Sequence, residues 1–346
     1  MTSPLLSERS AHHQPGTLGA ATLRSYRSPS KSLALGRLRR GVRRQWPWFA
    51  VAAIAISAAG AAYDLSGGVP ASTALTFWIP LGVAAGLAIA FVRELGRNTV
   101  TSLSSFGKHR GYSILGAAPE LTVRTLRQLP PDQRTPLGCL AFQQASPFAT
   151  AFRDLQNNVS GDGVVAFAAA LPGEGATTAA LCTAISASQQ GRSVLVIDCD
   201  VRRRALTHAL GYDPDEGVLD ACVAPDRWQE FVGEEEEVGL HFIPAGRPRS
   251  AWRGLSGAPD LRNLLARARE HYDLIILDCP PALSSADAPA IASHAEKVVL
   301  VTAWDRTPLN AVRRAMQILQ RGQRPSTGVY VNRVPPEYRF GRLRGD

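Results

Sequence analysis

A glycine-containing loop between an apolar run and a helix-length segment is the feature that most constrains the fold. The loop is Leu171–Ala179, which follows the apolar run Val164–Ala170 and precedes the apolar segment Ala180–Gln190. Strand, tight loop and helix in this order form the context of a phosphate-binding loop. Glycines let backbone N–H groups turn toward an anion, and the helix N-terminus adds the positive end of its dipole. We therefore expect an anion-binding turn here.

The loop lacks one part of the usual phosphate-binding pattern. That pattern places a lysine before the hydroxyl residue, and this chain has Ala176 there. Thr177 or Thr178 is still placed to offer a hydroxyl to Mg²⁺. An ammonium group beside a phosphate oxygen contributes about 2–4 kcal/mol at an effective dielectric near 20, so its loss predicts weak binding of ATP with Mg²⁺. The loop residues predicted to bind nucleotide are Gly173, Glu174, Gly175, Ala176, Thr177 and Thr178.

The rest of the C-terminal region alternates apolar strand runs with stretches of helical periodicity. This alternation predicts an α/β fold, a doubly wound and mostly parallel sheet covered by helices on both faces. Ligands of such sheets lie at the carboxyl ends of the strands. The predicted strands are 164–170, 193–198, 239–244, 273–278, 297–302 and 328–332, and the predicted helices are 146–159, 177–190, 260–271, 287–293 and 308–320.

Two of the predicted strands end in an aspartate. Asp198 closes one strand and is followed by Asp200, and Asp278 closes another. A carboxylate at a strand end beside a phosphate-binding loop is where a nucleotide-hydrolysing protein holds Mg²⁺ or its waters. One such aspartate is also common in turns, but two of them predict a nucleotide site. We expect Thr177, Asp198 and Asp278 to hold the metal ion, directly or through water.

Two apolar runs near the N-terminus predict a transmembrane hairpin. They cover residues 46–63 and 74–92, each close to the ~20 residues that cross a bilayer. The turn between them is Asp64–Ser72. Basic residues flank both outer ends, which predicts cytoplasmic termini and an external turn. A buried hairpin in a soluble core is the alternative. The flanking residues are Arg37, Arg39, Arg40, Arg43, Arg44, Arg93, Arg97, Lys108 and Arg110.

Composition assigns the remaining segments. Residues 1–45 are rich in serine and arginine, which predicts a disordered cytoplasmic tail or, alternatively, a transit peptide. Residues 93–145 predict a linker, in which 112–119 is a candidate short strand, and residues 341–346 predict a short tail. Much of the net charge of +9 lies before residue 110, which favours a membrane surface over nucleic acid as the partner.

The five cysteines carry no pattern of metal ligands. They contain no C-x-x-C pair, which predicts a reduced compartment and small buried thiols. Cys199 and Cys279 each follow a site aspartate, so a redox pair is the alternative for these two.

Together the motifs resemble the cytoplasmic domain of the bacterial tyrosine kinases attached to polysaccharide co-polymerases, a branch of the deviant Walker A ATPases. The resemblance covers residues 146–340 and includes the hairpin as a membrane anchor. Pro172–Thr178 resembles the Walker A motif and Asp198–Arg202 the second motif, Walker A′. Asp278–Pro281 resembles Walker B, and Gly328–Arg333 resembles the last strand of that family.

The resemblance implies roles for further residues. Arg202 and Asn332 are implied nucleotide contacts, with Asn332 near the base. Asp198, Asp200 and Asp278 would be the catalytic acids of an active kinase. ATP with Mg²⁺ is the implied cofactor. The implied location is the bacterial inner membrane with two spans, where a homo-oligomer could form.

The chain also departs from the family pattern outside the loop. In the helix 146–159, the ring-forming Glu-x-x-Arg-x-x-Arg motif is replaced by Thr150, Arg153 and Gln156, which leaves Arg153 as the candidate oligomer contact. Tyr338 stands alone where the family has a tyrosine-rich tail, and it is the candidate phospho-acceptor. The external segment is a turn, so a separate co-polymerase or polymerase subunit with a periplasmic domain is the expected partner.

These implications define the expected function, a membrane-anchored regulator or scaffold of exopolysaccharide or capsule export with a degenerate ATP site. The first alternative is an active tyrosine autokinase with a divergent loop, and the second is a partition-type ATPase. The first alternative needs a positive charge in place of the lysine. Arg202, Arg203 and Arg204 follow the second motif and are the candidates to supply it.

Overall fold

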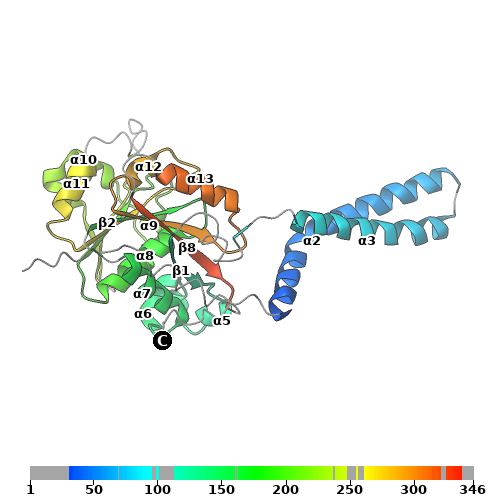
Figure 1. The fold of residues 1–346 in the computed structure, drawn as a ribbon, viewed down its shortest axis with the longest axis horizontal. Coiled ribbons are helices and arrows are strands. Elements are labelled where there is room, and N and C mark those ends of the chain that lie inside the picture. The colour runs from blue at the N-terminus through cyan, green and yellow to red at the C-terminus, as the bar shows by residue number, and fades with distance from the viewer. Residues whose placement is uncertain are drawn as a thin grey trace, which may run out of the picture.

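The computed structural model describes residues 31–68, 70–95, 99–100, 113–159, 161, 163–236, 238–247, 255, 261–320 and 325–336. A helical hairpin formed by α2 and α3 extends from an α/β domain (Figure 1). Residues 1–30 of the predicted N-terminal tail lie outside the described residues, and so does the whole predicted C-terminal tail, residues 341–346.

The hairpin helices are longer than the predicted apolar runs. Helix α2 covers Lys31–Ser66 and α3 covers Ala71–Leu95, so residues 31–45, which composition assigned to a disordered tail, are helical. Among the described helices, only α2 is long and apolar enough to cross a membrane, over Phe49–Ser66. The apolar part of α3, Thr76–Ile89, falls short of that criterion, so the second predicted span is not confirmed.

Small residues line the contact between α2 and α3. A Cβ added to Gly82 would lie 2.2 Å from the Ser57 hydroxyl oxygen and 2.6 Å from the Ala53 carbonyl oxygen. A Cβ on Gly86 would lie 2.9 Å from the Phe49 carbonyl oxygen. Close backbone approach at glycines is typical of helices that associate inside a membrane.

Large apolar side chains point away from this contact. Those that are exposed on the two helices are Trp46, Val51, Ile54, Tyr63, Leu65, Phe77, Ile79, Leu81, Val83, Leu87 and Ile89. Near the turn, the Trp78 indole N–H donates to Asp64 at 2.8 Å, which satisfies a polar group of each helix. An apolar exterior around a small-residue contact is typical of helices that pack together inside a bilayer.

Eight described strands form one sheet in the order β1-β8-β7-β2-β6-β3-β5-β4. Every neighbouring pair is parallel except β4 and β5, so the predicted doubly wound, mostly parallel sheet is confirmed. The strands are β1 Ser113–Pro119, β2 Gly163–Ala169, β3 Val194–Asp198, β4 Gly233–Glu235, β5 Leu240–Ile243, β6 Leu274–Asp278, β7 Lys297–Ala303 and β8 Ser326–Val334.

Helices cover both faces of the sheet (Figure 1). Alternate residues of β2 belong to different cores: Val164 and Ala166 face one, and Val165 and Phe167 face the other. The first core includes residues of α10 Val218–Val223, the 3-10 helix η2 Pro225–Phe231, α11 Leu261–Ala268, α12 Asp287–Ala292 and α13 Leu309–Leu319. The second includes residues of α6 Pro136–Phe142, α7 Pro147–Val159, α8 Ala176–Ser188 and α9 Ala205–Ala209.

The structure corrects the predicted linker. Strand β1 pairs in parallel with β8, and it is followed by α5 Val123–Leu126, the 3-10 helix η1 Pro131–Gln133 and α6. Leu129, Cys139 and Leu140 are buried in the second core. The α/β fold therefore includes residues 113–142, whose prolines interrupt the periodicity that identified the other elements.

Enlarging a glycine in the helix contact should loosen the hairpin. Gly82→Leu places a side chain where the partner backbone already lies, and overpacking of this kind costs about 1–3 kcal/mol. We expect a lower thermal midpoint for the helical circular dichroism signal of the detergent-solubilised chain. Ala84→Leu is the matched control because Ala84 is exposed on the same helix. Equal midpoints for the two variants would show that the glycine contact does not hold the helices together.

Candidate nucleotide site

The phosphate-binding loop adopts a glycine-dependent turn between β2 and α8. Gly173 has φ of 79° and Gly175 has φ of 97°, in the left-handed region that other residues rarely adopt. Gly175 is the residue before the first turn of α8, which begins at Ala176. The free N–H groups of that turn face the carboxyl edge of the sheet, as an anion site requires. The predicted strand, loop and helix are therefore formed.

The Glu174 side chain links this loop to the connection that follows β7. Its side chain is only 4% exposed, and its carboxylate accepts hydrogen bonds from the Leu171 N–H and the Thr307 hydroxyl. Burial raises the pKa of Glu174, and these hydrogen bonds partly offset that rise. The Glu174 side chain therefore shapes the loop, and the predicted contact of this loop residue with nucleotide stays a prediction.

Thr307 also joins the loop to the chain that follows α3. The Thr307 carbonyl accepts from the Val100 N–H at 2.9 Å, and the Val100 carbonyl accepts from the Asp305 N–H at 2.7 Å. Val100 is fully buried in the first core. Sequence reasoning missed both Thr307 and Val100, because neither belongs to a motif and their contacts join distant segments.

Asn332 supports the loop from the side of β8. Its amide N–H donates to the Glu174 carbonyl at 3.1 Å, and its amide oxygen accepts from the Arg333 N–H at 2.8 Å. A Cβ on Gly175 would lie 2.2 Å from the Asn332 amide nitrogen. Both ends of this amide are thus used inside the protein, and the implied contact with a base stays a prediction.

Asp198 and Asp278 lie directly opposite each other at the ends of β3 and β6, as predicted. Asp278 is 1% exposed, and neither of its carboxylate oxygens has a hydrogen-bond partner. Burial raises the pKa of Asp278 well above its usual value, the Asp198 charge raises it further, and the nearby Thr177 hydroxyl partly offsets the rise. An orphaned buried carboxylate of this kind requires a proton or a cation.

The other two acids are held by backbone N–H groups. Asp198 accepts from the Asp200 N–H at 3.1 Å and from the Thr207 N–H at 2.9 Å, and Asp200 accepts from the Arg203 N–H at 3.2 Å. Burial raises the pKa of both carboxyls, and these hydrogen bonds partly offset it. Thr207, whose hydroxyl also donates to Asp198 at 2.7 Å, was not among the predicted residues.

The residues available to a metal ion are few. No described residues form a group of three or more His, Cys, Asp or Glu side chains able to hold a metal by themselves. Mg²⁺ usually takes only one or two carboxylates and completes its shell with water and substrate phosphates. Asp278 with the Thr177 hydroxyl fits that requirement.

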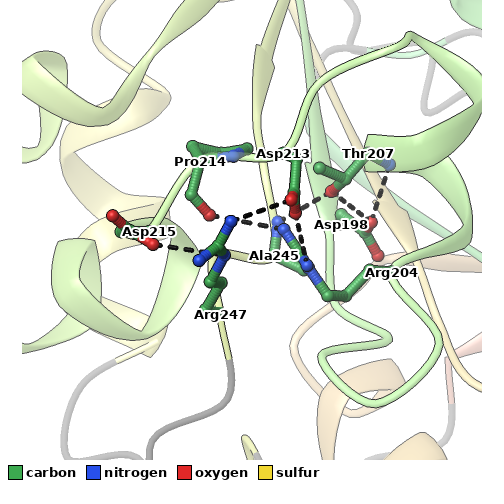
Figure 2. Close-up of polar contacts among 8 residues, drawn as sticks. All are labelled: Asp198, Arg204, Thr207, Asp213, Pro214, Asp215, Ala245 and Arg247. Carbon is green, nitrogen blue, oxygen red and sulfur yellow. Dashed lines mark hydrogen bonds and ion pairs between the residues drawn. The ribbon is translucent and has the colours of Figure 1, made fainter.

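Arg204 is already committed to another part of the fold. Its guanidinium pairs with Asp213 at 2.7 Å and donates to the Pro214 carbonyl at 3.3 Å (Figure 2). It therefore does not supply the charge of the absent lysine. Arg202 and Arg203 are exposed next to Asp200, whose pKa their charges act to lower. These two remain the arginine candidates at this edge of the sheet.

The remaining predicted residues lie away from the loop. Arg153 donates to the Thr150 hydroxyl at 3.1 Å on the surface of α7. Gln156 is 2% exposed and its amide oxygen has no hydrogen-bond partner, so it is not on the surface with Arg153. Tyr338 lies outside the described residues. All five cysteines are free and buried, and the predicted small thiols Cys199 and Cys279 are packed in the first core.

Replacing Asp278 should stabilise the metal-free protein. Its raised pKa means that, above the usual range for aspartate, the folded chain keeps a proton that the unfolded chain has released, so stability falls as pH rises. Asp278→Asn removes the buried orphan and should add about 1–3 kcal/mol near neutral pH. Chemical unfolding in chelator at several pH values measures this, and the variant should show a flatter pH dependence.

Asp273→Asn is the control for that prediction. Asp273 directly precedes β6, the strand that Asp278 ends. Asp273 is exposed, and its hydrogen bonds with Ser193 lower its pKa. Its contribution is present above the usual aspartate pKa and is lost as pH falls, so this variant should be less stable near neutral pH. If both substitutions destabilise the protein, the buried Asp278 carboxylate does not lower the stability of the folded chain, and the prediction is wrong.

Comparison with known proteins agrees with this geometry. A family model described as an AAA domain matches residues 163–325. EpsB of Ralstonia solanacearum, a candidate tyrosine-protein kinase, is 29% identical over 278 residues, which cover 75% of this chain and 36% of EpsB. The succinoglycan biosynthesis transport protein ExoP of Rhizobium meliloti is 30% identical over 153 residues, which cover 43% of this chain and 20% of ExoP. The match thus spans little more than a third of EpsB and a fifth of ExoP.

A solved structure shares the fold. The kinase domain of the Escherichia coli tyrosine kinase ETK superposes with a TM-score of 0.59 at 21% identity, covering 70% of this chain and 97% of that domain. At this identity the likeness establishes the fold alone. The resemblance drawn from the motifs is confirmed: residues 163–325 match the AAA domain model, the domain shares the fold of a solved bacterial tyrosine-kinase domain, and the relatives include proteins named as bacterial tyrosine-protein kinases.

Proposed function

We propose that the chain is a membrane-anchored regulator or scaffold of exopolysaccharide export whose P-loop domain binds ATP with Mg²⁺ weakly. One observation carries the proposal: the loop keeps its glycine-dependent shape and the orphaned Asp278, yet Ala176 occupies the lysine position. The name of the relative ExoP, a succinoglycan biosynthesis transport protein, supports the pathway, and the name of EpsB supports a kinase-like domain. The α2–α3 hairpin, with its apolar exterior, supports the membrane anchor.

Each part of the site would act on the nucleotide in a defined way. The backbone N–H groups after Gly173 would hold the phosphates by hydrogen bonds and the helix dipole. Thr177 and Asp278 would hold Mg²⁺, which supplies charge stabilisation to the phosphates when bound. Without an ammonium group on the loop, less of the phosphate charge is neutralised. Weak binding with little hydrolysis follows.

An active tyrosine autokinase is the second candidate function. The preserved carboxylate at Asp278 favours it, because a site with no remaining use would not need a buried orphan charge. In this case Arg202 or Arg203 would supply the positive charge, and Tyr338 would be the phospho-acceptor. The hairpin disfavours the third candidate, a partition-type ATPase that works without a membrane anchor.

We also propose a separate partner with a periplasmic domain. The turn between α2 and α3 contains too few residues to form a domain that grips a growing glycan. A co-polymerase or polymerase subunit would supply that contact, and a homo-oligomer through the surface of α7 near Arg153 would be a further assembly. Nucleic acid is not expected as a partner.

Restoring the lysine tests the degenerate site. Ala176→Lys should tighten ATP·Mg²⁺ binding at least about tenfold, because ~1.4 kcal/mol is enough for that factor. Adding Thr177→Ala to this variant should reverse the gain by removing the metal-side hydroxyl. Calorimetric titration at two salt concentrations measures both. Gln189→Lys, which adds the same charge at the far end of α8, should change nothing.

The opposite result would favour the autokinase. Tight binding by the unmodified chain, no gain from Ala176→Lys, and transfer of radiolabel from ATP to tyrosine would overturn the degenerate-site proposal. Loss of that transfer in Arg202→Ala or Arg203→Ala would then identify the compensating arginine.

Reporter fusions test the two-span topology. Gly67 lies in the exposed turn that follows α2. A reporter inserted there should behave as external, and a reporter at the C-terminus should behave as cytoplasmic. If both reporters are external, α3 does not return across the membrane and the anchor is a single span; if both are cytoplasmic, neither helix crosses it.

A further inference from the structure

The two aspartates that face each other across β3 and β6 have unequal surroundings. Asp198 is fully buried and accepts three hydrogen bonds, one at Oδ1 from the Asp200 N–H and two at Oδ2 from Thr207. Asp278 is equally buried and accepts none. The register makes their backbone positions equivalent, so the difference comes from the side chains and loops around them.

Thr207 is the residue that creates this difference. Its backbone N–H and its hydroxyl both donate to Asp198 Oδ2, at 2.9 and 2.7 Å. The same hydroxyl oxygen accepts from the Ala245 N–H at 3.0 Å, which directs the hydroxyl proton toward Asp198. Thr207 is itself fully buried, so water does not compete for these contacts.

A cluster of ion pairs fixes the short helix that carries Thr207. Arg204 is the residue before α9, and its guanidinium pairs with Asp213. Asp213 also pairs with Arg247 at 3.0 Å, and Arg247 pairs with Asp215 at 3.2 Å. Figure 2 shows this cluster beside the contact of Thr207 with Asp198. The cluster ties α9 to the loop after it and to the segment that leaves β5.

We propose that Thr207 is a positioning residue that holds Asp198 as a structural carboxylate, so that Asp278 alone presents its carboxylate to the metal ion of a bound nucleotide. The metal half of this inference rests on the proposed function. The sequence predicted that Asp198 and Asp278 both hold the metal ion; this proposal assigns that role to Asp278 alone.

The hydrogen bonds of Asp198 explain why it stays in place. Turning its carboxylate toward a metal ion would leave the N–H and hydroxyl of Thr207 without an acceptor in a dry interior. A carboxylate offers about four lone-pair positions, and three are used here. Asp278 has both oxygens available, and the Thr177 hydroxyl at the start of α8 lies near it. Binding a cation at Asp278 satisfies an orphaned group, whereas binding one at Asp198 would create new ones.

The experiment uses four variants of the full chain in detergent: Asp198→Asn, Asp278→Asn, Thr207→Val and Thr207→Ser. The first measurement is the thermal midpoint in chelator. We expect Asp278→Asn to raise the thermal midpoint. Asp198→Asn and Thr207→Val should lower it by a few degrees, since 1 kcal/mol corresponds to about 2–4 °C in a domain of this size. Thr207→Ser should leave the midpoint close to that of the unmodified chain because it keeps the hydroxyl. The same sign of change for the two aspartate variants would overturn the division of roles.

The second measurement is the affinity for Mn²⁺ in the presence of ADP, followed by electron paramagnetic resonance. We expect Asp278→Asn to weaken Mn²⁺ binding by about tenfold or more and Asp198→Asn by no more than about threefold, since one direct ligand is worth roughly 1.4 kcal/mol or more. Equal losses in the two variants would overturn the metal half of the inference.

A double variant separates positioning from simple stability. Thr207→Val combined with Asp278→Asn removes the hydroxyl that holds Asp198 and should recover part of the Mn²⁺ affinity that Asp278→Asn loses. A merely structural threonine would give no recovery, and that result would count against the inference. If the unmodified chain binds no Mn²⁺ with ADP, the proposed nucleotide binding fails together with the metal half, and the thermal midpoints then decide the structural role of Thr207 by themselves.

Discussion

The parallel pairing of β3 with β6 is the constraint on which the candidate site depends. Its register places Asp198 opposite Asp278, and β2, on the other side of β6, delivers the glycine loop to the same edge. Because three neighbouring strands end together, a phosphate loop and two carboxylates converge without any long excursion of the chain. The same register sets two buried acids side by side, and the structure relieves this conflict by giving the available hydrogen-bond donors to only one of them.

Contacts within the protein hold the shape of the phosphate-binding loop. Glu174 contacts the connection after β7 through Thr307, and Asn332 contacts the loop backbone from β8. Val100 reaches the same connection from the segment that follows α3. The loop is therefore joined to two strands and to the chain that follows the α2–α3 hairpin, and a change at any of these contacts acts on loop geometry without touching a phosphate.

Local patterns predicted most of the fold, and tertiary contacts decided what they missed. The apolar runs that end at Asp198 and Asp278 identified β3 and β6 because a buried parallel strand needs a continuous apolar sequence. The candidate strand 112–119 is formed as β1, but residues 120–142 have short elements and three prolines, so no periodic pattern showed that they belong to the domain. Strand β4 is only three residues long and carries the exposed Glu234, and Thr207 and Thr307 act through contacts with distant segments. No local sequence pattern predicts these features.

Shape and charge are separable properties of this loop, and the separation explains how a nucleotide fold persists around Ala176. In the described structure, the glycines, Glu174 and Asn332 fix the backbone through contacts that a lysine side chain does not enter. Ala176 in place of a lysine is therefore compatible with the folded loop, and its proposed effect is on the attraction for phosphate alone. The aspartates at the edge of the sheet differ from the loop in this respect. Asp278 is buried without a hydrogen-bond partner, so a proton or a cation is needed to offset the cost of burying its charge. Metal binding at Asp278 would therefore remain favourable even with the weak nucleotide binding that we propose.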